Sequence, residues 1–487
     1  MKKKILIMGC LCILVAGCSR ISRPPPISQI QPHSTRSGIA YTMQGKDFSH
    51  DAWWKKLQDP VLDQLIHLAL IHNNQIKNAH ANVLQARAKL KEAHFAWLPT
   101  LNASLNGIAG GGWDSNIKPV GHPSPLTTAF SNIGTIHFRG YYTGFVPQYS
   151  LNFLQTWQKE KYARASLAVQ CATYQSTRLS VISQVAGSYF MLLGQKQQLQ
   201  EQLQLLHDIK TMRALESARY HHGISDLSTV ISYDKQMANY QANITTVRNS
   251  IAQNENALQV LINKNPTAML TKKNINQLSV TKLIPQRLPS SVLKNRPDVI
   301  TARANLRVTE ANLGIAYSNF FPQINLTGIL GAASFELSHL LSLSTGLWVA
   351  EGIASVPAFN GVYYAQIKEA KAGYYAAYYN YLQTLRSVFA DVDNSLTNQQ
   401  QVNAAYLRQS QALRAADRSY QLSLARYRAG TKDYREVINA AITRDNAQLD
   451  LNQAKMQQLD GIVTVYQAIA GGYKQDLRKT SKAKRKL

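Results

Sequence analysis

A short pattern that occurs twice limits what this 487-residue chain can fold into. Residues 218–230 and 425–437 carry Ala, Arg, Tyr, Gly, Asp and Val in the same order and spacing. In each copy a helix is expected to end at the Gly, which adopts the left-handed conformation easily, and the Asp that follows can cap the next helix. The pattern therefore predicts two helical hairpins, with tips near Gly223 and Gly430.

Long uninterrupted helices are expected beside each tip, because no proline lies between Pro147 and Pro266 or after Pro357. The helices before the tips are expected over residues 156–222 and 363–429, roughly 100 Å each at about 1.5 Å per residue. Their content of Gln, Asn, Ser and Arg is too polar for contact with lipid. We therefore expect these helices to stand in water.

The N-terminus has the features of a secretory signal that ends at a lipidation site. Met1 is followed by three lysines at residues 2–4, residues 5–15 form an apolar stretch too short to span a bilayer, and small residues precede Cys18. Residues 14–18 resemble a bacterial lipoprotein box, which implies acylation of Cys18, and Ser19 after the cysteine favours the outer membrane by resemblance to Gram-negative lipoproteins. An ordinary secretory signal with an incidental cysteine is the alternative.

The chain has a formal net charge of +26, from 53 Lys and Arg against 27 Asp and Glu. This charge favours an anionic partner, which could be phospholipid, lipopolysaccharide or nucleic acid. After lipidation and loss of the signal, Cys171 is the one free cysteine, so no disulfide can form within the chain. We expect Cys171 to be buried as a small apolar side chain.

The hydrophobic pattern changes from a helical period to a period of two within the chain. Apolar residues recur every three or four positions over residues 62–97, as in one amphipathic helix opened by Asp59 as its cap. Residues 101–106 then alternate between apolar and polar, as expected of a strand between lipid and water. We predict two β-hairpins, over residues 100–153 and 323–359.

The second half of the chain repeats the first, including the proline that stops the helix before each hairpin. Proline-rich stretches predict a tether near the N-terminus and a connector between the repeats. The predicted segments are a lipoprotein signal peptide over residues 1–17, a lipidated N-terminus and tether over 18–52, a first repeat over 53–263, an equatorial connector over 264–297, a second repeat over 298–472 and a basic C-terminal tail over 473–487.

Two hairpins supply four strands per chain, which is too few to close a barrel in a membrane. Open sheet edges are not tolerated in hydrocarbon, and membrane barrels need about eight strands or more. Three chains would supply twelve strands, whereas two would make a narrow barrel filled by its own side chains. The expected fold class is therefore mainly α with membrane β: long, duplicated α-helical hairpins, with four strands from each chain in a trimeric, 12-stranded β-barrel.

Several motifs in this order resemble the outer membrane factor family of tripartite efflux pumps, in its lipoprotein branch. The resemblance covers residues 53–472 and rests on Trp53-Trp54 with Asp59-Pro60, Asn-Arg-Pro-Asp-Val at 295–299, Phe320-Phe321-Pro322, Pro-Ala-Phe-Asn-Gly at 357–361 and the two tips. It implies a homotrimer with a short β-barrel in the outer membrane and an α-barrel that crosses the periplasm. The implied function is an exit channel for drugs or other small amphiphiles. The implied partners are a periplasmic adaptor and an inner-membrane transporter. The resemblance also implies that the chain has no enzymatic activity and needs no cofactor.

By position in the family motif, the resemblance also implies site residues at the tips. Near a three-fold axis, tip side chains from three chains can plug the bore with hydrogen bonds and ion pairs that break when the tips splay. The candidate gate residues are Tyr427, Lys432, Glu436, Asp226 and Thr229. The candidate adaptor contacts are Arg219, Tyr220, Gly223, Arg426 and Gly430.

Each of these assignments has a purely structural alternative. Asp226 and Asp433 can act only as helix caps, Arg219 and Arg426 can be solvated, and both glycines can serve only the turn. At the level of function, an exit channel for type I protein secretion would use the same scaffold. The charge alone suggests a nucleic-acid-binding coiled-coil protein. An envelope hydrolase is a remote alternative, because the sequence shows no group of catalytic or metal-binding residues that would support it.

Overall fold

The computed structural model describes residues 25, 36, 38, 41–42, 48–111, 137–271, 273–280, 283, 288–289, 294–342, 346–357 and 359–474. Cys18, most of the predicted tether and residues 475–487 of the predicted tail lie outside the described residues. None of the described helices is both long and apolar enough to cross a membrane.

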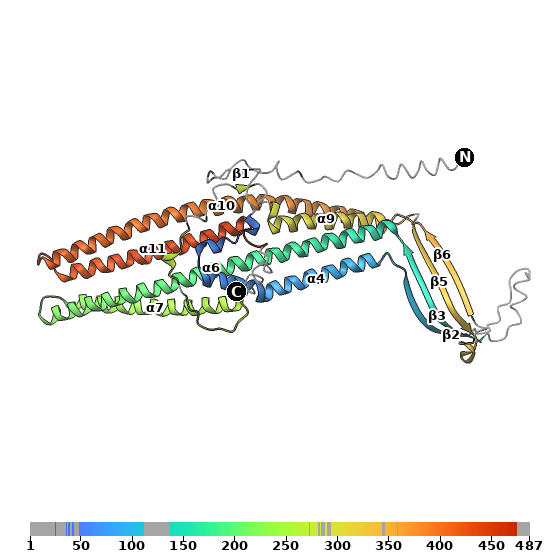
Figure 1. The fold of residues 1–487 in the computed structure, drawn as a ribbon, viewed down its shortest axis with the longest axis horizontal. Helices are drawn as coiled ribbons and strands as arrows, with labels where there is room; N and C mark the ends of the chain where they lie inside the picture. Colours follow the sequence, from blue (N-terminus) through green and yellow to red (C-terminus); the bar gives the residue numbers. More distant parts are fainter. Residues whose placement is uncertain are drawn as a thin grey trace, which may run out of the picture. The chain divides into compact units, whose positions relative to one another are not determined.

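The described chain is mainly helical, and one order of elements occurs in both halves: helix, two strands, then two helices (Figure 1). The elements are β1 (Tyr41–Thr42), η1 (Phe48–His50), η2 (Trp53–Leu57), α3 (Pro60–His72), α4 (Asn74–Phe95), β2 (Thr100–Gly111), β3 (His137–Leu151), α6 (Phe153–His221), α7 (Leu227–Leu261), η3 (Ile275–Gln277), β4 (Leu288–Pro289), α9 (Pro297–Ser318), β5 (Gln323–Ser334), η4 (Leu337–His339), β6 (Gly346–Ser355), α10 (Gly361–Arg428) and α11 (Tyr434–Ala468).

The chain divides into two compact units, each built from several segments. Unit 1 comprises Met1–Val83, Val169–Arg303 and Ala377–Leu487. Unit 2 comprises Leu84–Ala168 and Ala304–Ala376. The helices α4, α6, α9 and α10 each contribute residues to both units.

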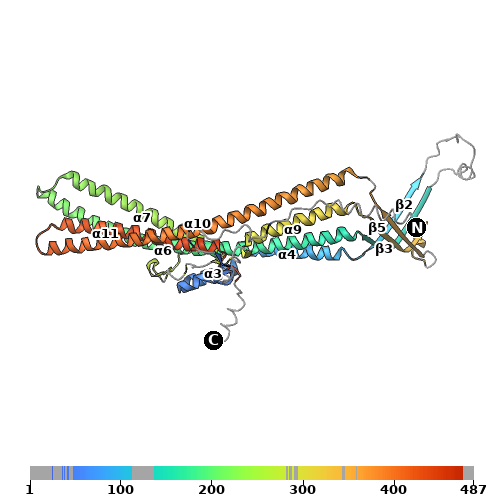
Figure 2. The same ribbon diagram turned by 90° about the horizontal axis from the view of Figure 1, so that it is seen from above.

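Unit 1 contains two long helical hairpins. The helices α6 and α7 run together to one tip, and α10 and α11 run together to a second tip (Figures 1 and 2). The helices that lead to the tips contain 69 residues in α6 and 68 in α10, and they end at His221 and Arg428. Both ends lie one residue before the ends expected from the sequence.

Unit 2 contains a four-stranded antiparallel sheet in the order β2-β3-β5-β6. Strands β3 and β5 come from different halves of the chain and pair at its centre, where Gly144 lies opposite Gly331. A Cβ atom on either glycine would collide with the backbone of the other strand, so this close approach requires glycine. Within the described residues, β2 and β6 have a partner strand on one side, so both edges of the sheet are open.

The core of unit 1 joins the segment before α3 to the end of α11. Trp53 stacks on Tyr466 with ring centroids 4.9 Å apart, and both side chains are buried. Asp59 caps α3 by accepting a hydrogen bond from the Val61 amide at 2.9 Å, and the Tyr189 hydroxyl donates to its other oxygen at 2.7 Å. Burial and the Asp59 carboxylate raise the pKa of Tyr189, so this hydroxyl remains a donor.

The single amphipathic helix expected over residues 62–97 is wrong, because Asn73 divides it into α3 and α4. The Asn73 side chain accepts hydrogen bonds from the amides of Gln75 and Ile76 at 2.9 and 3.2 Å. Its amide group also donates to the Leu261 carbonyl of α7 at 2.9 Å. Asn73 therefore caps a new helix while fastening the break to a distant segment.

Two smaller expectations also need correction, and one pairing was not expected. The last strand ends at Ser355 and not near Phe359, since Pro357 cannot donate to the ladder. The end of the predicted tether pairs with the connector, as β1 lies parallel to β4. Cys171 is half-buried and not buried.

Candidate functional site: the two hairpin tips

The first tip is closed by backbone hydrogen bonds around Gly223, which has a φ of +71°. The amide of Gly223 donates to the Tyr220 carbonyl at 2.9 Å, and the amide of Ile224 donates to the Arg219 carbonyl at 2.8 Å. These bonds satisfy the last carbonyls of α6, and the left-handed turn favours glycine. The turn at this tip leads to Asp226, the residue that caps the start of α7.

Asp226 caps α7 and is held by Thr229. Its Oδ1 atom accepts from the Thr229 amide at 2.9 Å, and its Oδ2 atom accepts from the Thr229 hydroxyl at 3.1 Å. Hydrogen bonds from the Ser228 hydroxyl and then from Thr229 lower the pKa of Asp226 to about 2, so the carboxylate is charged at neutral pH. The structure thus pairs two of the five candidate gate residues with each other.

The second tip repeats this geometry around Gly430, which has a φ of +72°. Its amide donates to the Tyr427 carbonyl at 2.9 Å, and the amide of Thr431 donates to the Arg426 carbonyl at 3.0 Å. Asp433 caps α11 by accepting from the Arg435 amide at 3.0 Å. The capping role considered for Asp226 and Asp433 is therefore confirmed.

The three candidate gate residues of the second tip make exposed contacts. Lys432 Nζ lies 2.7 Å from Glu436 Oε1, and both side chains are more than 40% exposed. The Tyr427 ring lies 5.0 Å from the ring of Tyr434 and is 43% exposed. Such exposed contacts are individually weak and can exchange for contacts with another chain.

A buried carboxylate, Glu216, joins the two tips within one chain. Its side chain is 1% exposed, and its Oε1 atom lies 2.7 Å from Arg435 Nε of α11, although these atoms are not aligned for a hydrogen bond. Its Oε2 atom accepts from the Ser225 hydroxyl at 2.7 Å and lies 3.8 Å from Arg219 Nε. Arg219 in turn donates to Asp433 Oδ2 at 3.0 Å, so the solvated alternative for Arg219 is wrong.

Glu216 and Arg435 are functional candidates that the sequence analysis missed. Their signal is weak: Glu216 lies one helical turn before Arg219, where opposite charges are neighbours. Arg435 lies in the other half of the chain, so its pairing with Glu216 depends on the fold.

The candidate adaptor contacts lie on an open surface. Tyr220 is 40% exposed, Arg426 is exposed, and a Cβ atom added at Gly223 or Gly430 would meet no atom within 4 Å. Next to the first glycine, Ile224 is 64% exposed. The glycines are therefore required by their positive φ and not by crowding within the chain.

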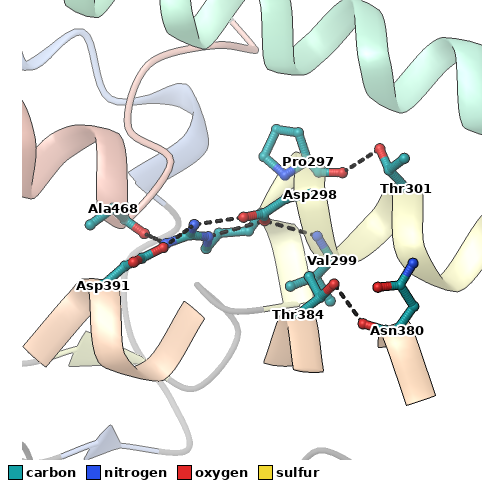
Figure 3. Close-up of polar contacts among 9 residues, drawn as sticks. Pro297, Asp298, Val299, Thr301, Asn380, Thr384, Asp391 and Ala468 are labelled. Carbon is teal, nitrogen blue, oxygen red and sulfur yellow. Dashed lines mark hydrogen bonds and ion pairs between the residues drawn. The ribbon is translucent and has the colours of Figure 1, made fainter. Parts of the chain in front are cut away.

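A second charged group joins Asp298 of α9, Asp391 in the middle of α10 and Ala468 at the end of α11 (Figure 3), and Arg296 makes the contacts. Arg296 Nη1 donates to the Ala468 carbonyl at 2.7 Å, and its Nε and Nη2 atoms donate to the Asp298 carboxylate at 3.1 and 2.6 Å. Nη2 also donates to Asp391 of α10 at 3.2 Å. The Asn-Arg-Pro-Asp motif thus ties the start of α9 to α10 and to the last turn of α11.

The chain matches the family model described as outer membrane efflux protein over residues 65–264 and 288–471. It is 28% identical to the cation efflux system protein CusC of Escherichia coli over an alignment of 485 residues, and the match covers 96% of this chain and 99% of CusC. It is 26% identical to the probable outer membrane lipoprotein SilC of Salmonella typhimurium over an alignment of 481 residues, and the match covers 97% of this chain and 99% of SilC.

The fold is similar to that of a solved outer membrane channel, CmeC of Campylobacter jejuni. The TM-score is 0.80, with 21% identity, and the match covers 96% of this chain and 98% of CmeC. The expected fold class, the suspected family and the outer-membrane location are confirmed by these similarities together.

Proposed function

We propose, from the premise that this chain belongs to the outer membrane efflux protein family, that three copies assemble into the outer-membrane exit channel of an efflux pump. The observation that carries the proposal is the sheet of unit 2, whose edge strands β2 and β6 have no second partner among the described residues. Within a membrane every backbone polar group needs a partner, so β6 of one copy pairs with β2 of the next. Three copies then close a 12-stranded barrel.

The gate of this channel is formed by the tips. Tyr427, Lys432 and Glu436 are exposed within one chain and available to neighbouring copies around the axis. Asp226, held by Thr229, presents a carboxylate that remains charged at neutral pH, which suits an ion pair with a lysine of the next copy. Opening exchanges these contacts between copies, whereas the buried Glu216 group keeps the two tips of each copy together.

The partners are a periplasmic adaptor and an inner-membrane transporter. The adaptor binds at the tips, where Arg219, Tyr220 and Gly223 of the first tip and Arg426 and Gly430 of the second border open surface. Exposed apolar side chains at Ile224, Leu227 and Ile231 support a protein contact there. The acylated Cys18 anchors the N-terminus in the outer membrane.

The cargo is drugs or other small amphiphiles, and two other cargo classes share the scaffold. CusC is named for cation efflux, and a type I secretion channel would export protein. A strain that lacks this protein is expected to be inhibited by lower concentrations of amphiphilic drugs, and the wild-type gene restores growth. Inhibition by metal salts alone would favour cations, and loss of one secreted protein with unchanged drug resistance would favour secretion.

A further inference from the structure

Three carboxyl groups meet between α6 and α11 of unit 1, away from the tip residues. Glu201 and Asp208 come from α6, and Asp445 comes from α11, where it follows Arg444. Asp445 and Glu201 are 6% and 7% exposed, so neither carboxyl is hydrated as a surface group would be. This group has no part in the proposed gate or adaptor contacts.

Asp445 lacks a donor for one of its two oxygens. Its Oδ1 atom accepts from Nε and Nη2 of Arg444 at 2.8 and 2.7 Å. Its Oδ2 atom is buried and has no hydrogen-bond donor among the described residues. Asp208 is the third carboxyl of the group, and the Asp445 carboxylate acts to raise its pKa. A carboxyl group that is buried close to a second carboxylate favours its protonated form, because the two charges would repel each other.

Glu201 extends the same group along α6. Its Oε1 atom accepts from the side-chain amides of Gln197 and Gln448 at 2.8 and 3.2 Å. Its Oε2 atom is buried and has no hydrogen-bond donor among the described residues. Burial raises the pKa of Glu201 to about 7, and the nearby Asp445 carboxylate acts in the same direction.

Further charged side chains from α6, α10 and α11 lie around this group. Arg444 serves Asp445 and stacks over the Tyr420 ring at 4.4 Å, and His207 adds an exposed imidazole beside Asp208. Arg444 and Asp445 line a cavity of about 360 Å³ together with residues of α10. The charged residues that α10 contributes to this cavity are Arg414, Asp417 and Arg418. Burial is the main cause that raises the pKa of Asp208, and the Asp445 carboxylate adds to it. The positive charges of Arg444 and His207 lower this pKa, but they do not offset the rise.

We propose that Glu201 and Asp208 of α6, packed beside the Asp445 carboxylate of α11, form a proton-binding site that holds α11 against α6 when it is protonated and weakens this contact when it ionises. The folded chain favours the protonated form, since the pKa of Glu201 is raised above its ordinary value of 4.5. The site therefore stabilises the fold fully below about pH 4.5, and this stabilisation is lost as the pH rises through about 7. Because α11 starts at the second tip, the site links external pH to the helix that carries Glu436.

The test is the melting temperature of the full-length protein in detergent between pH 5 and pH 8. Glu201→Gln and Asp208→Asn mimic the protonated side chains without changing their shape. We expect the double variant to melt several degrees above the wild type at pH 8, and the difference to vanish near pH 5. Asp234→Asn is the matched control, since Asp234 is exposed on α7 and pairs with Arg213 at 3.0 Å. Its difference from the wild type should not depend on pH in this range.

Two results would overturn the proposal. If the melting temperatures of the double variant and the wild type differ by the same amount at every pH in this range, the site does not take up a proton. A rise in the wild-type melting temperature on adding Mg²⁺ or Ca²⁺ at pH 8, absent in the double variant, would show that the carboxylates bind a metal ion instead.

Discussion

Single residues at the tips differ in how firmly one chain holds them. The ion pair of Lys432 with Glu436 is exposed and contributes only about 0.3–0.5 kcal/mol, as other i,i+4 pairs do. Glu216 is buried beside Arg435 and Arg219, and removing one partner of such a group costs about 3–5 kcal/mol. Opening of the gate should therefore exchange the exposed contacts and leave the buried group intact.

This difference predicts the effect of substitutions in the gate. In the proposed gate Tyr427 and Lys432 plug the bore, so replacing both by Ala is expected to raise the single-channel conductance in planar bilayers. Tyr364 and Lys368 are a matched control, because they are the same residue types in contact on α10, with the Lys368 nitrogen 4.7 Å from the ring centre. Their double Ala variant should conduct as the wild type does, and an unchanged current in the tip variant would remove Tyr427 and Lys432 from the gate.

The hairpin tip, as an element, can be tested for adaptor binding. Ala or Trp at Gly223 or Gly430 suffers the same strain from the positive φ, and neither Cβ atom meets a neighbour within the chain. The two variants thus differ in bulk at the surface. We expect the Trp variants to lose cross-linking to the adaptor and drug resistance, and the Ala variants to retain most of both. Equal behaviour of Ala and Trp would show that the glycines serve the turn alone.

Elements defined by local residue patterns could be predicted from the sequence, whereas elements that depend on distant partners could not. The ends of α6 and α10 and the caps at Asp226 and Asp433 follow from residues a few positions apart. The break at Asn73 was missed because part of its support is the Leu261 carbonyl of α7. The buried contact between Glu216 and Arg435 was missed for the same reason, as it joins the two halves of the chain.

The whole molecule is incomplete as one chain. Its sheet has an open edge at β2 and another at β6, and nothing within the described residues covers either. A membrane does not tolerate such edges, so the chain needs further copies to function as a channel. This requirement is central, since the proposed gate and bore depend on the same assembly.

The most direct measurement is the mass of the purified, detergent-solubilised protein, determined by light scattering with the detergent contribution subtracted. The account predicts a protein mass of three chains per particle, unchanged on dilution. A particle with one chain at every concentration would contradict it.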